Sequence, residues 1–261
     1  MRKYLAMFIA LATLGCSGGT PQVVHTWVQD NNLWMEDSAN FASPNVSEED
    51  FNAIIDLAED LYAPIAEEWE ETLAIHRLWE EPTVNASAWR DGMGKTAIRM
   101  YGGLARRAEI TPQGFALVLC HELGHLYGGI PYIRKYLKMA AEGQSDYYGA
   151  GWCLKSIVEQ FSPDADAEAT AYMEKVCSTE LDVYDGDAGI CELQLAAGQS
   201  LGTLLSVIRG KDVPDFETPD PTVAKKTLVS YPDTIQCRLD TYHNGTLGQD
   251  RPLCWYKPEK D

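Results

Sequence analysis

The sequence predicts an α+β fold that is rich in helix, contains a small sheet and is stapled by disulfides. Segments with apolar residues at helical spacing make up most of the chain, two short segments between residues 84 and 101 have the character of strands, and seven cysteines are present. With 261 residues, 45% of them hydrophobic, the chain can bury a core of ordinary size. It has no repeat of fixed period and no second linker, so we expect one domain over residues 25–261.

The N-terminus has the pattern of an export signal. A basic pair at positions 2 and 3 precedes an apolar run over residues 4–14 that is too short to span a membrane. The chain continues with Leu14-Gly15-Cys16-Ser17, which resembles the lipobox of bacterial lipoproteins. We therefore expect a signal peptide over residues 1–15, a lipidated Cys16, a flexible tether to residue 24 and a location at the bacterial cell envelope, in the periplasm or at the outer membrane. A plain secretory signal, which would release the protein, is the alternative.

Charge and cysteine content restrict the partners and the compartment. The formal charge at pH 7 is −18, and removal of the signal with Arg2 and Lys3 takes it to −20. Such a surface repels phosphate backbones and anionic head groups, so we expect no nucleic acid partner and no membrane contact except through the lipid anchor. After Cys16 an even number of cysteines remains, which suits three disulfides in an exported protein: Cys120, Cys153, Cys177, Cys191, Cys237 and Cys254. The sequence does not choose among their 15 possible pairings.

The first half of the chain predicts one long helix and two strands. Ser47 is a suitable N-cap, acidic residues follow it, and apolar residues recur at helical spacing, so we expect a helix over residues 47–78. A break at Glu81-Pro82 leads to strands over residues 84–89 and 96–101. The second strand could add an extended peptide at its edge, or could be an edge protected by a charge such as Arg99.

The second half predicts helices and an irregular tail. Thr111 and Pro112 are an N-cap and a first helical residue, and they open a helix that ends near Leu126, before two glycines. Further helices are expected over residues 139–161, 162–176 and 191–208. The tail from Asp212 is rich in proline and contains two cysteines, so we expect it to be irregular and held down by disulfides.

The helix that begins at Thr111 contains the motif H-E-x-x-H. Residues at i and i+4 lie about 40° apart around a helix, so His121 and His125 share a face and can bind one cation together. Glu122 could act as general base toward a metal-bound water, as the glutamate of this motif does in metallopeptidases. A helix with two histidines and no metal is the alternative.

A catalytic zinc takes three protein ligands and keeps a fourth position open, so a third ligand is needed. Glu142 and Asp146 begin the next helix, 17 residues after His125, and are themselves i and i+4. One carboxylate can bind the metal while the other accepts the free ring N–H of a ligand histidine, although such a pair can also be a solvated helix turn. Cys120 points about 100° away from His121, which favours a disulfide or packing over a fourth ligand.

These motifs resemble those of gluzincin metallopeptidases, whose third zinc ligand is a glutamate with an aspartate four residues later. The order of the strand at 84–88, the strand that ends in Gly102-Gly103-Leu104 and the H-E-x-x-H helix is similar to that of CAAX-prenyl-protease-like metallopeptidases and their soluble periplasmic relatives. A shorter likeness covers residues 228–242. The resemblance implies a gluzincin-type fold with one Zn²⁺ per chain. In that site the ligands are His121, His125 and Glu142, and the base is Glu122. Asp146 does not bind the metal but accepts the free ring N–H of a ligand histidine.

The sequence thus predicts a zinc metalloendopeptidase that hydrolyses peptide or protein substrates at the cell envelope. The alternatives are a zinc hydrolase of a non-peptide cell-wall amide and a non-catalytic envelope lipoprotein with a structural metal. Hydrolysis also needs a donor for the oxyanion. The candidates are Arg238 and Tyr231 from the shorter likeness, and His243, whose setting also suits a surface residue. We expect Tyr147, Tyr148, His25 and His76 to be structural.

Overall fold

The computed structural model describes residues 24–36, 45–161, 169–179 and 187–258. The expected signal peptide, Cys16 and all but the last residue of the expected tether lie outside these ranges. The fold is mixed α+β, with many helices, a small sheet and three disulfides, which confirms the coarse prediction. Among the described residues, no helix has both the length and the apolar character needed to cross a membrane.

The main sheet has four strands in the order β1-β3-β4-β2. These strands are β1 (Val24–Thr26), β2 (Thr72–Leu78), β3 (Ala86–Arg90) and β4 (Lys95–Tyr101). β3 is antiparallel to both of its neighbours, whereas β2 and β4 are parallel. The sequence predicts β3 and β4 as strands. β1 begins at Val24, the last residue of the expected tether.

The helix predicted over residues 47–78 is wrong in its second part. α1 (Glu48–Glu68) begins with a capping box in which the Ser47 side chain accepts from the Asp50 backbone N–H. The chain then turns through Glu70, which has a φ of 56°, and continues as β2. Leu73 and Ile75 alternate with exposed residues, and β2 pairs with β4 along its whole length. This pairing satisfies the backbone N–H and C=O groups of β2. The spacing of apolar residues along the sequence does not reveal such a long-range pairing.

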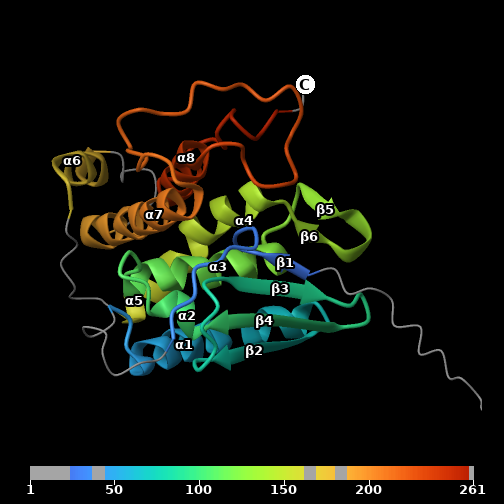
Figure 1. Cartoon of the computed structure of the whole chain (residues 1–261). Coiled ribbons are helices and arrows are strands. Elements are labelled where there is room, and N and C mark those ends of the chain that lie inside the picture. The colour runs from blue at the N-terminus through green and yellow to red at the C-terminus, as the bar shows by residue number, and fades with distance from the viewer. Residues whose placement is uncertain (1–23, 37–44, 162–168, 180–186, 259–261) are drawn as a thin grey trace, which may run out of the picture.

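The described residues form several α-helices, and α3 (Pro112–Tyr127) lies at their centre. The helices are α1, α2 (Gly102–Ala105), α3, α4 (Glu142–Tyr148), α5 (Leu154–Phe161), α6 (Ala171–Thr179), α7 (Ala188–Arg209) and α8 (Ile235–Thr246). α3 lies between the sheet on one side and α7 and α8 on the other (Figure 1). From Gly114 to Tyr127 all its residues are buried, and the apolar side chains among them belong to a core cluster that extends from Trp27 to Leu247. α3 is therefore positioned to hold functional side chains away from bulk water.

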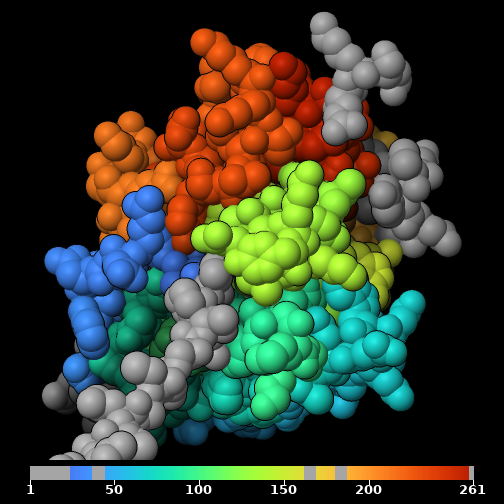
Figure 2. Space-filling model, turned by 90° about the vertical axis from the view of Figure 1, so that its right-hand side faces the viewer, coloured from blue at the N-terminus to red at the C-terminus, as the bar shows by residue number. Residues whose placement is uncertain are grey.

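The helices after α3 agree with the prediction in part. The segment predicted over residues 139–161 consists of α4, a π-helical turn (Gly149–Cys153) and α5, but its first residues form strand β6 (Met139–Ala140). β6 pairs with β5 (Tyr132–Arg134), and a 3-10 turn (Lys135–Leu137) joins them. Figure 2 shows this yellow-green region on the surface, between green and cyan atoms of the N-terminal half below it and orange and red atoms of the C-terminal segments above it.

The C-terminal part contains more helix than predicted. α7 covers the predicted helix at 191–208, and α6 overlaps the one at 162–176, whose first residues lie outside the described ranges. The tail is not irregular throughout, because it contains α8. The side chain of Thr234 caps α8 by accepting from the Cys237 backbone N–H. The prolines that suggested an irregular tail lie before and after α8, not inside it.

The three disulfides join neighbouring elements. Cys120 of α3 pairs with Cys153 of the π-helical turn, Cys177 of α6 pairs with Cys191 of α7, and Cys237 of α8 pairs with Cys254 of the tail. Three disulfides are what the sequence predicts, and the fold selects one pairing from the possible ones. Cys120 is therefore a disulfide partner and not a fourth metal ligand.

Candidate metal centre

His121 and His125 lie on successive turns of α3, and Glu142 is the first residue of α4. The Oε2 atom of Glu142 is 3.4 Å from Nε2 of His121 and 3.5 Å from Nε2 of His125. The three side chains are at most 3% exposed. The structure thus brings together the three residues that the motif and the resemblance single out as ligands.

The three facing atoms fit a metal ion. Within the described residues, Nε2 of His121, Nε2 of His125 and Oε2 of Glu142 are buried and make no hydrogen bond. Buried polar atoms without partners are costly, and a cation between them would supply the missing interaction. In a tetrahedral zinc site with metal–ligand distances of about 2.0–2.1 Å, ligand atoms lie roughly 3.3–3.5 Å apart. The observed distances match this spacing, so the group can hold a metal ion.

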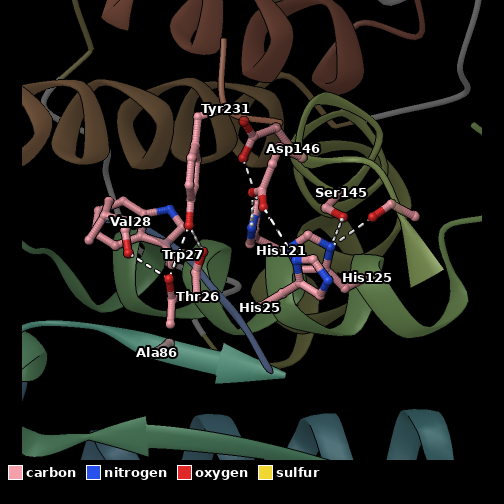
Figure 3. Close-up of polar contacts among 12 residues, drawn as sticks. His25, Thr26, Trp27, Val28, Ala86, His121, His125, Ser145, Asp146 and Tyr231 are labelled. Atoms are coloured by element: carbon pink, nitrogen blue, oxygen red, sulfur yellow. Dashed lines mark hydrogen bonds and ion pairs between the residues drawn. The ribbon is translucent and has the colours of Figure 1, made fainter. Parts of the chain in front are cut away.

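The other ring nitrogen of each histidine has a partner, as Figure 3 shows. Nδ1 of His121 is 2.7 Å from Oδ1 of Asp146. Nδ1 of His125 is 2.9 Å from the carbonyl oxygen of Ala140 and 3.0 Å from Oγ of Ser145. Because a carbonyl oxygen only accepts, Nδ1 of His125 carries the proton. These contacts leave the Nε2 lone pairs free to bind a metal, which is the usual arrangement behind ligand histidines.

Arg238 of α8 holds Asp146 in place. Its Nε donates to Oδ2 of Asp146 at 2.8 Å, its Nη2 donates to Oδ1 at 2.7 Å, and both side chains are fully buried. Its Nη1 donates to the carbonyl oxygen of Trp27 at 3.0 Å. Burial would raise the pKa of Asp146, but Arg238 and His121 hold that pKa below its usual value. Arg238 therefore supports the candidate ligand His121 through Asp146. This role differs from the role of oxyanion donor, for which the sequence makes Arg238 a candidate.

Glu122 is a buried carboxyl beside the ligands. Both of its oxygens are buried and have no hydrogen-bond partner among the described residues. Burial raises the pKa of Glu122 to about 8, with a further contribution from Glu142, although the neighbouring His121 opposes the shift. A carboxyl of this kind takes up a proton more readily than an ordinary glutamate, which is the property that a general base near neutral pH requires.

A close approach of two helices brings the ligands together. Gly124 lies between the two histidines of the motif, and a Cβ added to it would be 2.8 Å from the backbone of Ser145. The absence of a side chain lets α3 and α4 touch at this point. Glu142 consequently lies within reach of His121 and His125, although it follows the nearer one by 17 positions in the sequence.

The other two oxyanion candidates, Tyr231 and His243, and the two tyrosines that were expected to be structural all have partners of their own. The hydroxyl of Tyr231 donates to the carbonyl oxygen of Thr26, and burial together with the charge of Glu142 raises the pKa of Tyr231. His243 is hydrogen-bonded to Tyr172 and packs against Phe216, so the structure does not bring it to the ligands. Tyr147 and Tyr148 make structural contacts, to the carbonyl oxygen of Gln249 and to the hydroxyl of Tyr62.

His25 is a neighbour of the site that the sequence analysis missed. Its Nδ1 is 3.9 Å from Oε1 of Glu142, and its ring centroid is 5.2 Å from that of His125. The residue was expected to be structural because it has no spaced partner in the sequence. The run of β-branched residues around it, Val23-Val24-His25-Thr26, is a strand signal that the assignment to a tether obscured.

Comparisons with known proteins do not identify the chain, since no family model, no curated protein and no solved structure matches it. The function is therefore inferred from the site itself. The site combines a buried His-His-Glu group able to hold a metal ion, an adjacent buried carboxyl and a buried ion pair behind one of the histidines.

Proposed function

We propose that this protein is a zinc metallopeptidase of gluzincin type, which hydrolyses peptide bonds in peptide or protein substrates. One observation carries the proposal. The buried Nε2 atoms of His121 and His125 and Oε2 of Glu142 face one another without partners, and the buried carboxyl of Glu122 lies beside them. Three protein ligands leave a tetrahedral ion one open position, which is the arrangement of catalytic zinc sites. A glutamate in the base position of H-E-x-x-H favours hydrolysis over a structural metal.

In this proposal zinc supplies Lewis acidity: it polarises the substrate carbonyl and increases the acidity of the attacking water. Glu122 accepts a proton from the water while the oxygen atom of that water attacks the carbonyl carbon of the substrate. When the C–N bond breaks, Glu122 passes this proton to the leaving amine. Asp146 and Arg238 hold the ring of His121 in its orientation throughout, because their contacts do not involve the reacting atoms.

The N-terminal sequence supports a location at the bacterial cell envelope. In this part of the proposal, the signal peptide directs export and lipidation of Cys16 anchors the enzyme to a membrane. The three disulfides are consistent with an oxidising compartment outside the cytoplasm.

Hydrolysis by the zinc-loaded mature chain is the test of this function. We expect cleavage of internally quenched peptides, a loss of at least about 100-fold on treatment with 1,10-phenanthroline, and recovery when zinc is added back. Peptidoglycan fragments are assayed in parallel. Cleavage of these fragments without cleavage of peptides would favour the cell-wall amide hydrolase, and zinc binding without any hydrolysis would favour the structural-metal alternative.

A further inference from the structure

We propose that His25 is a catalytic residue of this site. In this role its imidazole donates a hydrogen bond from Nε2 to the carbonyl oxygen of the substrate as negative charge develops there. The inference rests on the proposed hydrolase function and supplies the oxyanion donor that such a reaction needs.

The position of His25 places a polar atom without a partner next to the ligands. Its Nε2 is buried and makes no hydrogen bond within the described part of the chain. Its ring lies 5.2 Å from the ring of His125 at an interplanar angle of 34°. Its Nδ1, at 3.9 Å from Oε1 of Glu142, is beyond hydrogen-bond distance, so that contact does not fix which nitrogen carries the proton. A tautomer with the proton on Nε2 is therefore available to donate.

His25 lies beside the ligand group and not within it. The donor atoms that lie within 4.8 Å of one another come from His121, His125 and Glu142. His25 approaches Oε1 of Glu142, whereas Oε2 of the same carboxylate faces His121 and His125. The open coordination position that hydrolysis requires is thus compatible with a nearby imidazole.

His25 is also more exposed than the residues of the ligand group. Its side chain is 15% exposed, whereas those of His121, His125 and Glu142 are at most 3% exposed. Glu122 is fully buried. Within this set of residues, His25 is the one with appreciable contact with solvent.

The strand that carries His25 is fixed from several directions, as Figure 3 shows in part. β1 pairs with β3, and His25 is opposite Ala88. The carbonyl oxygens of the next three residues accept from the side chains of Tyr231, Arg238 and Asn85, respectively. Arg238 binds Trp27, the residue that follows β1, and Asp146 at the same time, so it couples the end of this strand to the candidate metal centre. A donor fixed in this way needs no reorganisation during the reaction, which makes its hydrogen bond effective.

The other candidate donors are already engaged. Arg238 gives its N–H groups to Asp146 and to the carbonyl oxygen of Trp27. Tyr231 donates its hydroxyl proton to the carbonyl oxygen of Thr26, and His243 is bonded to Tyr172. Of the candidates that the sequence suggested and the neighbour that the structure revealed, His25 is the one with a buried nitrogen that lacks a hydrogen-bond partner among the described residues.

The test compares His25→Phe and His25→Gln in the mature chain, purified in detergent and loaded with zinc. Phenylalanine keeps a ring against His125 but donates nothing, whereas the amide N–H of glutamine can reach the position of Nε2. We expect kcat to fall by about 10²–10³-fold in His25→Phe with a small change in KM, and to recover at least tenfold in His25→Gln. Zinc content stays at one ion per chain in both variants. His243→Gln is the matched control and keeps the wild-type kcat.

Binding of a peptide phosphonate, which imitates the tetrahedral intermediate, provides a readout independent of turnover. Its Kd should rise in His25→Phe by about the factor lost in kcat, while the Kd of a product peptide changes little. Wild-type kcat or an unchanged phosphonate Kd in His25→Phe would overturn the inference and leave the proposed function intact. Loss of zinc from the folded variant would show that His25 is a ligand and would also overturn it. If the wild type hydrolyses no peptide, the proposed function fails, and the role of His25 fails with it. If His25→Phe does not fold, His25→Asn, whose shorter amide does not reach the Nε2 position, replaces it with the same expected loss.

Discussion

Glu122→Gln is expected to lower kcat for peptide hydrolysis by roughly 10²–10⁴-fold. Glutamine has nearly the same shape as glutamate but cannot take a proton from water, and Glu122 makes no hydrogen bond within the described residues that the change would break. The ligand atoms belong to other side chains, so zinc content should remain at one ion per chain. Steady-state kinetics on quenched peptides, with metal analysis of the same samples, measures both quantities.

The control for this prediction is the same substitution at Glu159. This residue lies on α5, where its exposed side chain forms a surface ion pair with Lys155. Glu159→Gln should leave both kcat and zinc content unchanged, because such pairs contribute little. Full peptidase activity in zinc-loaded Glu122→Gln would contradict the assignment of Glu122 as the base.

Arg238→Met is expected to lower the free energy of unfolding by about 3–5 kcal/mol, because it leaves the carboxylate of Asp146 buried without its counter-charge. The carbonyl oxygen of Trp27 loses its donor in the same variant. Zinc affinity should fall by about 10–100-fold, because Asp146 orients His121 and the variant removes the side chain that holds Asp146 in place. Urea unfolding of the zinc-free protein measures the first effect, and competition with a chelating dye measures the second.

Two further variants separate the causes of this loss. Arg77 forms an ion pair with Asp56 and Glu59 at a partly exposed position, so Arg77→Met should cost at most about 1 kcal/mol. Arg238→Met combined with Asp146→Leu removes both buried charges and should recover part of the stability. Zinc affinity should stay low in this double variant, because Asp146→Leu removes the acceptor of His121. Wild-type stability and zinc affinity in Arg238→Met would show that the ion pair does not support the site.

The sequence predicts the metal centre well where the spacing is local. The i, i+4 relation between His121 and His125 fixes a shared helix face, and Thr111 and Pro112 fix the start of that helix. The same i, i+4 relation between Glu142 and Asp146 indicates that these two carboxylates act together. The structure places all four side chains together because glycine at position 124 lets α3 and α4 approach. Local signals thus account for the residues of the candidate metal centre.

Long-range contacts account for what the sequence did not predict. The apolar residues of β2 fit a helix as well as a strand, and pairing with β4 decides between the two. The contact between Arg238 and Trp27 joins residues 211 positions apart, and no motif relates His25 to Glu142. These contacts depend on how the C-terminal helix and the N-terminal strand pack onto α3 and α4, which a single sequence does not specify.

Metal content tests the central claim most directly. The mature chain lacking Cys16 is purified in its oxidised form, dialysed against metal-free buffer and analysed for bound metal beside Glu142→Ala. The metal-site assignment predicts one zinc ion per folded wild-type chain, and loss or marked weakening of binding in the variant, because Oε2 of Glu142 faces both histidines. A folded, oxidised wild-type protein that binds no zinc, or a Glu142→Ala variant that binds it as tightly as the wild type, would contradict the assignment.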